Sequence, residues 1–200
     1  MKRLGIVGIL ALASGCASVG ELKEPNDIPS IVPSYRIKGL ESRTGDVATM
    51  LDLDECAESA ILLSSGLSGV PSVAGHFPVR KLVAREFQKV VVGNFRTMMP
   101  EEEPKLELRI VSNRMSVRRS WSRVKAEMSF EVQLVDPEHN RRPYFRKDYR
   151  LTSESVQRRK NEVPACVYSC IQNLALEFLK DVSKDTLVIS RLKALGSTAQ

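Results

Sequence analysis

VKAEMSFEVQL, the stretch from Val124 to Leu134, places an apolar side chain at every second position. Successive side chains of a β-strand point to opposite faces, so this period of two predicts a strand with one buried face and one wet face. Residues 105–118 and 143–152 also alternate, and only short connections separate them from the central stretch. Short connections favour antiparallel neighbours. The sequence therefore predicts an antiparallel meander with strands at 105–118, 122–135 and 143–152.

The first of these strands changes phase along its length. Its early apolar residues are Leu106, Leu108 and Ile110, whereas the later ones are Met115 and Val117. The apolar residues thus change from even-numbered to odd-numbered positions. Such a change indicates either an inserted residue, which makes a β-bulge, or a switch of the exposed face.

Apolar residues at helical spacing flank the meander on both sides. Residues 78–97 predict one helix with Pro78 in its first turn, and residues from 162 onward predict a second helix, followed by a shorter piece from about 185. The fold class predicted is α+β: a small antiparallel sheet with two amphipathic helices packed on one face.

Residues 35–76 carry weaker patterns. Residues 35–40 alternate and predict a strand, and residues 47–53 fit strand and helix spacing equally well. We favour a strand to Leu53, followed by a short apolar segment through Leu63. The stretch 64–76 is rich in Ser and Gly and predicts a loop.

The composition is that of a globular protein. The 200 residues are 42% hydrophobic and 27% charged, and 30 Lys and Arg against 24 Asp and Glu give a formal charge of +6. The longest apolar run is shorter than the roughly 20 residues that a membrane-spanning helix needs. No nucleic-acid recognition motif accompanies the basic residues, so we do not expect nucleic acid as a partner.

The N-terminus has the features of an export signal. Lys2 and Arg3 precede an apolar stretch of about a dozen residues, and small residues lead to Cys16. This arrangement resembles a bacterial lipobox, with Ala13 where the motif usually has Leu. The resemblance implies a signal peptide over 1–15 and lipidation of Cys16, whose acyl chains would anchor the protein. The alternative is an ordinary secretory signal that leaves Cys16 a plain thiol.

A proline-spaced tether is expected to follow the lipidated end. Residues 16–34 show no helical or alternating pattern, and at about 3.3 Å per residue they could extend some 60 Å from the bilayer. Residues 35–200 are expected to form a single α+β domain facing the periplasm. Ala17, rather than Asp, follows the cysteine, and in Gram-negative lipoproteins this resembles the signal for the outer membrane.

Three further cysteines stand at positions 56, 166 and 170. Export to an oxidising compartment permits disulfides, so a bridge from Cys56 to Cys166 or Cys170 is one possibility. The other is that all three are small buried hydrophobic residues, which we favour. No histidine lies near them in sequence, and we expect no metal site.

No catalytic constellation is present. No serine lies in a G-x-S-x-G motif, and His76 and His139 both fall in predicted loops. We therefore expect no catalytic residues, no cofactor and no enzymatic activity.

The best candidate for a contact surface is the connection between the first two strands of the meander. Trp121, the only tryptophan, lies there beside Arg118, Arg119 and Arg123. Trp and Arg are enriched at interaction hot spots, and such a tip could contact anionic head groups or an acidic partner. The alternative is a solvated hairpin whose charges only prevent edge pairing.

The lipobox, the proline-spaced tether and the α+β order together resemble the bacterial ABC-type transport auxiliary lipoproteins. That resemblance implies a non-enzymatic accessory subunit of an envelope transport or assembly complex of the lipid-trafficking type, anchored in the outer membrane. The competing interpretation is a stand-alone lipoprotein that binds a lipid or another small ligand.

Overall fold

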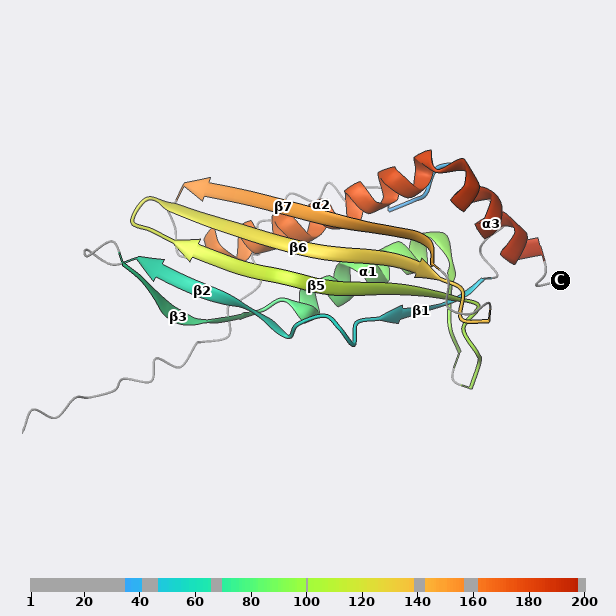
Figure 1. Ribbon diagram of the computed structural model, residues 1–200, viewed down its shortest axis with the longest axis horizontal. Helices are drawn as coiled ribbons and strands as arrows, with labels where there is room; N and C mark the ends of the chain where they lie inside the picture. Colours follow the sequence, from blue (N-terminus) through green and yellow to red (C-terminus); the bar gives the residue numbers. More distant parts are fainter. Residues whose placement is uncertain are drawn as a thin grey trace, which may run out of the picture.

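The computed structural model describes residues 35–40, 47–65, 70–99, 101–138, 143–156 and 162–197 (Figure 1). The predicted signal peptide, Cys16 and the tether lie outside these residues. In chain order the elements are β1 (Ala48–Asp52), β2 (Ser59–Ser65), β3 (Pro71–Pro78), α1 (Arg80–Asn94), β4 (Arg96–Thr97), β5 (Leu106–Arg119), β6 (Arg123–Val135), β7 (Pro143–Val156), α2 (Glu162–Lys184) and α3 (Thr186–Ser197).

The three long strands form the predicted antiparallel meander. β6 pairs with β5 on one side and with β7 on the other, and both pairings run nearly the full length of the strands. The predicted strand boundaries are correct to within one residue, apart from the end of β7, which continues to Val156.

The sheet is larger than predicted, and it is mixed. Among the described residues, seven strands belong to it. β1 and β2 both pair in parallel with the edge of β5 that β6 does not occupy, one after the other along that strand (Figure 1). β3 and β4 extend this side of the sheet, β3 antiparallel to β2 and β4 parallel to β1. The prediction of a small antiparallel sheet is therefore wrong outside the meander. Parallel pairing depends on contacts between distant segments, which the local sequence pattern does not report.

The phase change in β5 is a β-bulge. Ser112 pairs with Phe130 and Arg114 pairs with Ser129, so Asn113 is the extra residue. Before the bulge the even-numbered residues of β5 face the core, and after it the odd-numbered residues do. The bulge thus places Met115 and Val117 on the same face as Leu106, Leu108 and Ile110.

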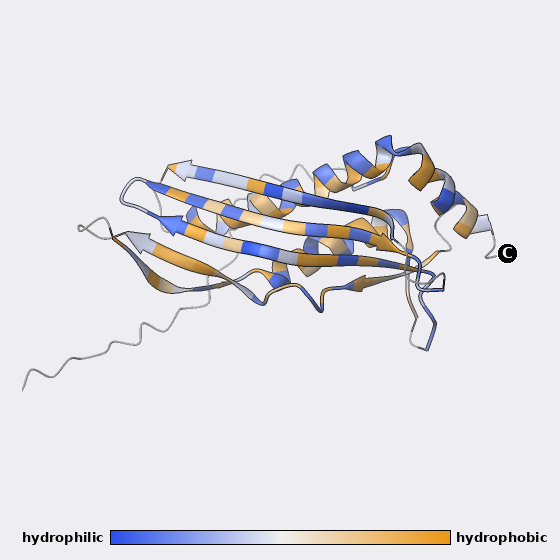
Figure 2. Ribbon diagram, in the orientation of Figure 1, coloured by the Kyte–Doolittle hydropathy of each residue, from blue (hydrophilic) through white to orange (hydrophobic). Residues whose placement is uncertain are grey.

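Helices α1 and α2 cover one face of the sheet, which we call the inward face (Figure 1). Even-numbered residues of β6 from Val124 to Leu134 are all buried on it, as the alternating colours along β6 in Figure 2 illustrate. Three aromatic rings pack together in this core. The ring centroid of Phe178 in α2 lies 6.0 Å from that of Phe87 in α1 and 5.6 Å from that of Phe145 in β7. The prediction of two helices on one face is confirmed, and α3 is a third helix that packs on α2 and β7.

The predicted loop at 64–76 is wrong, because β2 continues to Ser65 and β3 begins at Pro71. Of the described strands, only β2 pairs with β3. Almost all side chains of β3 are exposed, so its sequence shows no apolar alternation. The helix predicted from Pro78 begins only at Arg80. The backbone N–H groups of Val79 and Arg80 both donate to the carbonyl oxygen of Glu58, at 3.0 and 3.3 Å, and this holds the chain against β2 before the helix begins.

Residues 35–40 are not a strand. Their alternation is real, since Tyr35 and Ile37 are buried, but they pack on helices instead of pairing with a strand. The backbone N–H of Ile37 donates to the Asn94 side chain, whose Nδ2 donates to the carbonyl oxygen of Tyr35 at 2.6 Å. The N–H of Lys38 donates to Ser183 Oγ at 3.0 Å. This segment, which we call the N-terminal clamp, joins the end of α1 to the end of α2.

Cys56, Cys166 and Cys170 are free and buried, which is the interpretation favoured from the sequence; none of them forms the alternative bridge. The thiol of Cys166 donates to the carbonyl oxygen of Ser153, and that of Cys170 lies against the carbonyl oxygen of Ala126. Burial raises the pKa of Cys170 to about 12, so this thiol stays protonated at neutral pH. Within the part of the chain that the structure describes, no helix has the length and apolar character needed to cross a bilayer.

Gly93 is required by the N-terminal clamp. A Cβ atom at this position would lie 2.7 Å from the carbonyl oxygen of Tyr35. Replacing Gly by Ala inside a helix normally stabilises it by about 0.5–1 kcal/mol. We predict the opposite sign for Gly93→Ala, a loss of about 1–3 kcal/mol in the free energy of unfolding, because the clamp must shift. Urea denaturation of the purified protein measures this difference.

Val92→Ala is the matched control, since Val92 is on the same helix turn and 64% exposed. We expect its free energy of unfolding to stay within about 0.5 kcal/mol of wild type. A stabilised Gly93→Ala protein would show that residues 35–37 do not pack against this turn of α1.

Candidate functional site

The predicted contact surface lies at one end of the sheet, where β5 turns into β6. Ser120 N–H donates to the carbonyl oxygen of Arg123 at 2.8 Å, so the two strands are joined by a tight loop of Trp121 and Ser122. Trp121 is 73% exposed. Arg118, Arg119 and Arg123 are exposed as well, so the four predicted residues do gather at one hairpin.

The three arginines do not share one face. The alternation of the strands places Arg118 and Arg123 on the outward face of the sheet and Arg119 on the opposite side. Arg123 forms an ion pair with Glu154 of β7 at 3.0 Å. The hairpin therefore presents the indole at its tip with positive charge on both sides of it.

Other exposed apolar side chains lie at the same end of the sheet. Val70 precedes β3 and Val73 lies within it, and both are about two-thirds exposed. Val156, 57% exposed, ends β7 and pairs with Arg123. Figure 1 shows the β2–β3 end, the β5–β6 turn and the end of β7 together at one extremity of the molecule. We call this set the distal tip: Val70, Val73, Trp121 and Val156, with Arg118, Arg119 and Arg123.

The N-terminal clamp lies at the opposite end. Lys38 contacts Ser183 at the end of α2, whereas the start of α2 reaches the distal end through a hydrogen bond between Ser155 and Glu162. The long strands of the meander lie between these two ends (Figure 1). The segment through which the tether would join the domain therefore lies toward the end of the sheet away from the distal tip.

A buried charged network that the sequence analysis missed lies at Glu86. Its side chain has no solvent exposure and accepts hydrogen bonds from Tyr35 at 2.6 Å and from Lys89 at 2.8 Å. Burial alone raises the pKa of Glu86, but hydrogen bonds from Lys89, Tyr35 and Tyr168 outweigh it and hold the pKa below its usual value.

The burial of Glu86 could have been predicted from its position in the apolar repeat of the helix. Val83, Glu86, Phe87 and Val90 are related as i, i+3, i+4 and i+7, so a carboxylate stands in the apolar stripe of the helix. Each oxygen of the carboxylate has a partner, and Tyr35 belongs to the N-terminal clamp. The network is therefore part of the clamp. Across the described ranges, no group of three or more His, Cys, Asp or Glu side chains is placed to hold a metal ion.

Comparison with known proteins gives a likeness of fold. No family model matches the sequence, and no curated protein matches it significantly. A crystal structure of a Xanthomonas campestris protein assigned to DUF330 superposes with a TM-score of 0.56 and 12% identity, covering 81% of this chain and 96% of that one. The TM-score indicates a common fold, and at 12% identity the likeness shows nothing about the activities of the two proteins.

A second structure, of a proposed lipoprotein from Caulobacter crescentus, aligns with 12% identity over 66% of this chain and 89% of that one. Its TM-score of 0.38 is too low to establish a common fold. The lipidation of Cys16 and the roles of the distal-tip residues therefore stay predictions.

Because the Trp121 side chain is exposed, we expect it to contribute little to the stability of the fold. We predict that Trp121→Ala changes the free energy of unfolding by no more than about 0.5 kcal/mol, because the side chain is 73% exposed. Leu134→Ala, a fully buried position at the other end of β6, should cost about 2–5 kcal/mol. Thermal and urea unfolding give both values, and a large loss for Trp121→Ala would assign the indole to the core.

Proposed function

We propose that this protein is a lipoprotein of the bacterial envelope, anchored in the outer membrane through Cys16. In this proposal it is a non-enzymatic accessory subunit of an envelope transport or assembly complex of the lipid-trafficking type. The lipobox-like sequence before Cys16 supports the anchor. The observation that carries the accessory role is the distal tip, where a tryptophan that the fold does not bury is surrounded by arginines.

The position of the tip favours a protein partner over the anchoring membrane. The N-terminal clamp is at the other end of the sheet, so a stretched tether directs the tip away from the bilayer that holds the lipid. β5 alone contains 14 residues, which at about 3.4 Å per residue extend nearly 48 Å. A partner with an acidic surface complements the arginines, and the indole supplies apolar contact area.

The interior favours the accessory role over storage of a lipid. Phe87, Phe130 and Phe178 are fully buried between the helices and the sheet, and Ile171 and Leu174 fill the space beside them. Most apolar side chains of α1 and α2 are thus used in packing the core. The alternative function is that of a stand-alone module that binds a lipid or a small ligand. That function requires the packed side chains between the helices and the sheet to move apart.

The anchor is tested by Cys16→Ser. We predict that this variant loses acylation and moves from the membrane pellet to the soluble fraction, because the acyl chains supply the membrane affinity. Fractionation of cells that express either protein measures the change. Cys56→Ser, which removes a buried thiol, should leave the distribution unchanged. Equal membrane association of Cys16→Ser and wild type would contradict the anchor.

The accessory role is tested by site-specific photo-crosslinking in cells. A photoreactive amino acid at position 121 should capture a reproducible component of an envelope transport complex, identified by mass spectrometry. The same amino acid at position 92, which is also exposed but lies on α1, should not capture it. Efficient labelling that gives lipid adducts and no envelope protein would favour the ligand-binding alternative. Equal capture from both positions would contradict a specific tip.

A further inference from the structure

The outward face of the meander carries charged residues that are mostly paired. Arg146 of β7 pairs with Glu131 at 2.8 Å, and Lys125 pairs with Glu127 at 2.6 Å. Arg109 of β5 binds Asp52 and Glu107 at 2.8 and 3.1 Å. Pairing of this kind is the usual way to place charges on a solvated sheet face.

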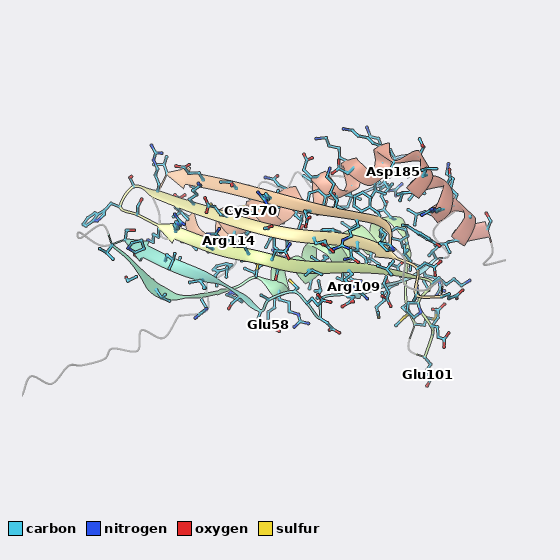
Figure 3. The ribbon with its side chains drawn as sticks, in the orientation of Figure 1. Glu58, Glu101, Arg109, Arg114, Cys170 and Asp185 are labelled. Carbon is cyan, nitrogen blue, oxygen red and sulfur yellow. The ribbon has the colours of Figure 1, made fainter. Side chains whose placement is uncertain are left out.

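Arg114 and Arg150 are different. Both are exposed on the outward face, and neither makes an ion pair or a side-chain hydrogen bond to any residue that the structure describes. They stand in one row across the sheet, because Ser129 of β6 pairs with Arg114 on one side and with Arg150 on the other. Figure 3 labels Arg114 beside β5, and the strand register places it on the face opposite the helices.

The row lies in a hollow of the surface. A depression of about 440 Å³ is lined by both arginines, by Ser129 and Thr152, and by Glu127, Met128 and Leu151. Adjacent strands are about 4.8 Å apart, so the two arginine Cα atoms are about 10 Å apart with the serine between them. Two guanidinium groups can thus converge above Ser129.

The bulge in β5 creates this row. If β5 ran through Asn113 as a regular strand, Asn113 would pair with Ser129, and Arg114 would face the core. The inserted residue turns Arg114 outward, to a position directly opposite Ser129. Bulges frequently re-aim a side chain in this manner at functional positions.

We propose that this depression, which we call the arginine groove, binds a phosphate group. A single guanidinium satisfies both oxygens of a carboxylate, whereas a tetrahedral phosphate offers enough oxygens for two guanidinium groups and for hydroxyl donors. Ser129 and Thr152 supply such hydroxyls. The groove is independent of the distal tip and of the lipid anchor.

One acidic side chain, that of Glu127, belongs to the lining of the groove itself. Glu127 is paired with Lys125, and its pKa is lowered by that hydrogen bond and by the charges of Lys125, Arg118 and Arg114. Asp148 precedes Arg150 by two residues on the same face, and its charge helps to raise the pKa of Arg146. These carboxylate charges oppose an anion in the groove, so the two arginines must hold it against their field.

The test is a titration of the full chain in zwitterionic detergent micelles, followed by the backbone amide signals of Ser129 and Thr152 in NMR spectra. The probes are inorganic phosphate, the acyl-free phosphodiester glycerophosphoglycerol and a hexaglutamate peptide. Phosphate or the phosphodiester should shift both signals. Tighter binding of the phosphodiester would identify a lipid head group as the source, and tighter binding of inorganic phosphate would identify the free ion.

Three matched variants locate the site. Arg114→Gln and Arg150→Gln should each weaken phosphate binding about tenfold, as expected for the loss of charge-assisted hydrogen bonds. Arg146→Gln makes the same change on the same face of β7, but at an arginine already paired with Glu131, and should change affinity less than about twofold. Far-UV circular dichroism verifies that each variant is folded.

Three results would overturn the proposal. They are the absence of a shift with either phosphate probe, an equal loss in Arg146→Gln, and tighter binding of hexaglutamate than of phosphate at the same signals. The last of these would identify the groove as a contact for an acidic protein segment.

Discussion

The packing of α2 on the inward face of β5, β6 and β7 is the contact on which the rest of this structure depends. The helix has 23 residues and is about 34 Å long, whereas the 13 residues of β6 extend about 44 Å. Its buried stripe covers most of that face and includes Val167, Ile171, Leu174 and Phe178. Because α2 begins beside Ser155, which pairs with Val124, none of the described helices extends over the turn beyond Val124. Trp121 is exposed at the distal tip for this reason.

The bulge at Asn113 and the interrupted edge of β5 belong together. β1 pairs with the first part of β5, and β2 pairs with the last part. The segment that connects β1 to β2 passes beside the bulge. There Ala57 N–H donates to Ser112 Oγ at 2.7 Å, and Ser112 N–H donates to the carbonyl oxygen of Glu55 at 3.3 Å. The irregular segment thus satisfies the backbone next to the bulge, and the same irregularity turns Arg114 toward the arginine groove.

The N-terminal clamp fixes residues 35–40 beside the ends of α1 and α2. Gly93 admits the backbone of Tyr35, Asn94 bonds it from both sides, and Glu86 holds its hydroxyl in a buried network. A chain that enters beside the ends of α1 and α2 leaves the other extremity free for contacts. The arginine groove lies between the two ends, on the face that the helices do not cover, so an anion there and a partner at the tip need not compete.

Local pattern was enough to predict β5, β6, β7 and most of α1 and α2, because burial of one face imposes a period of two on a strand and of 3.6 on a helix. It also placed Trp121 at a turn. It could not predict β3, most of whose side chains are exposed, or the parallel pairing of β1 and β2 with β5, which joins segments tens of residues apart. The partners of Glu86 and the row of Arg114, Ser129 and Arg150 come from three segments each. Only the tertiary structure decides such groupings, because strand register and helix packing bring together residues that no local repeat connects.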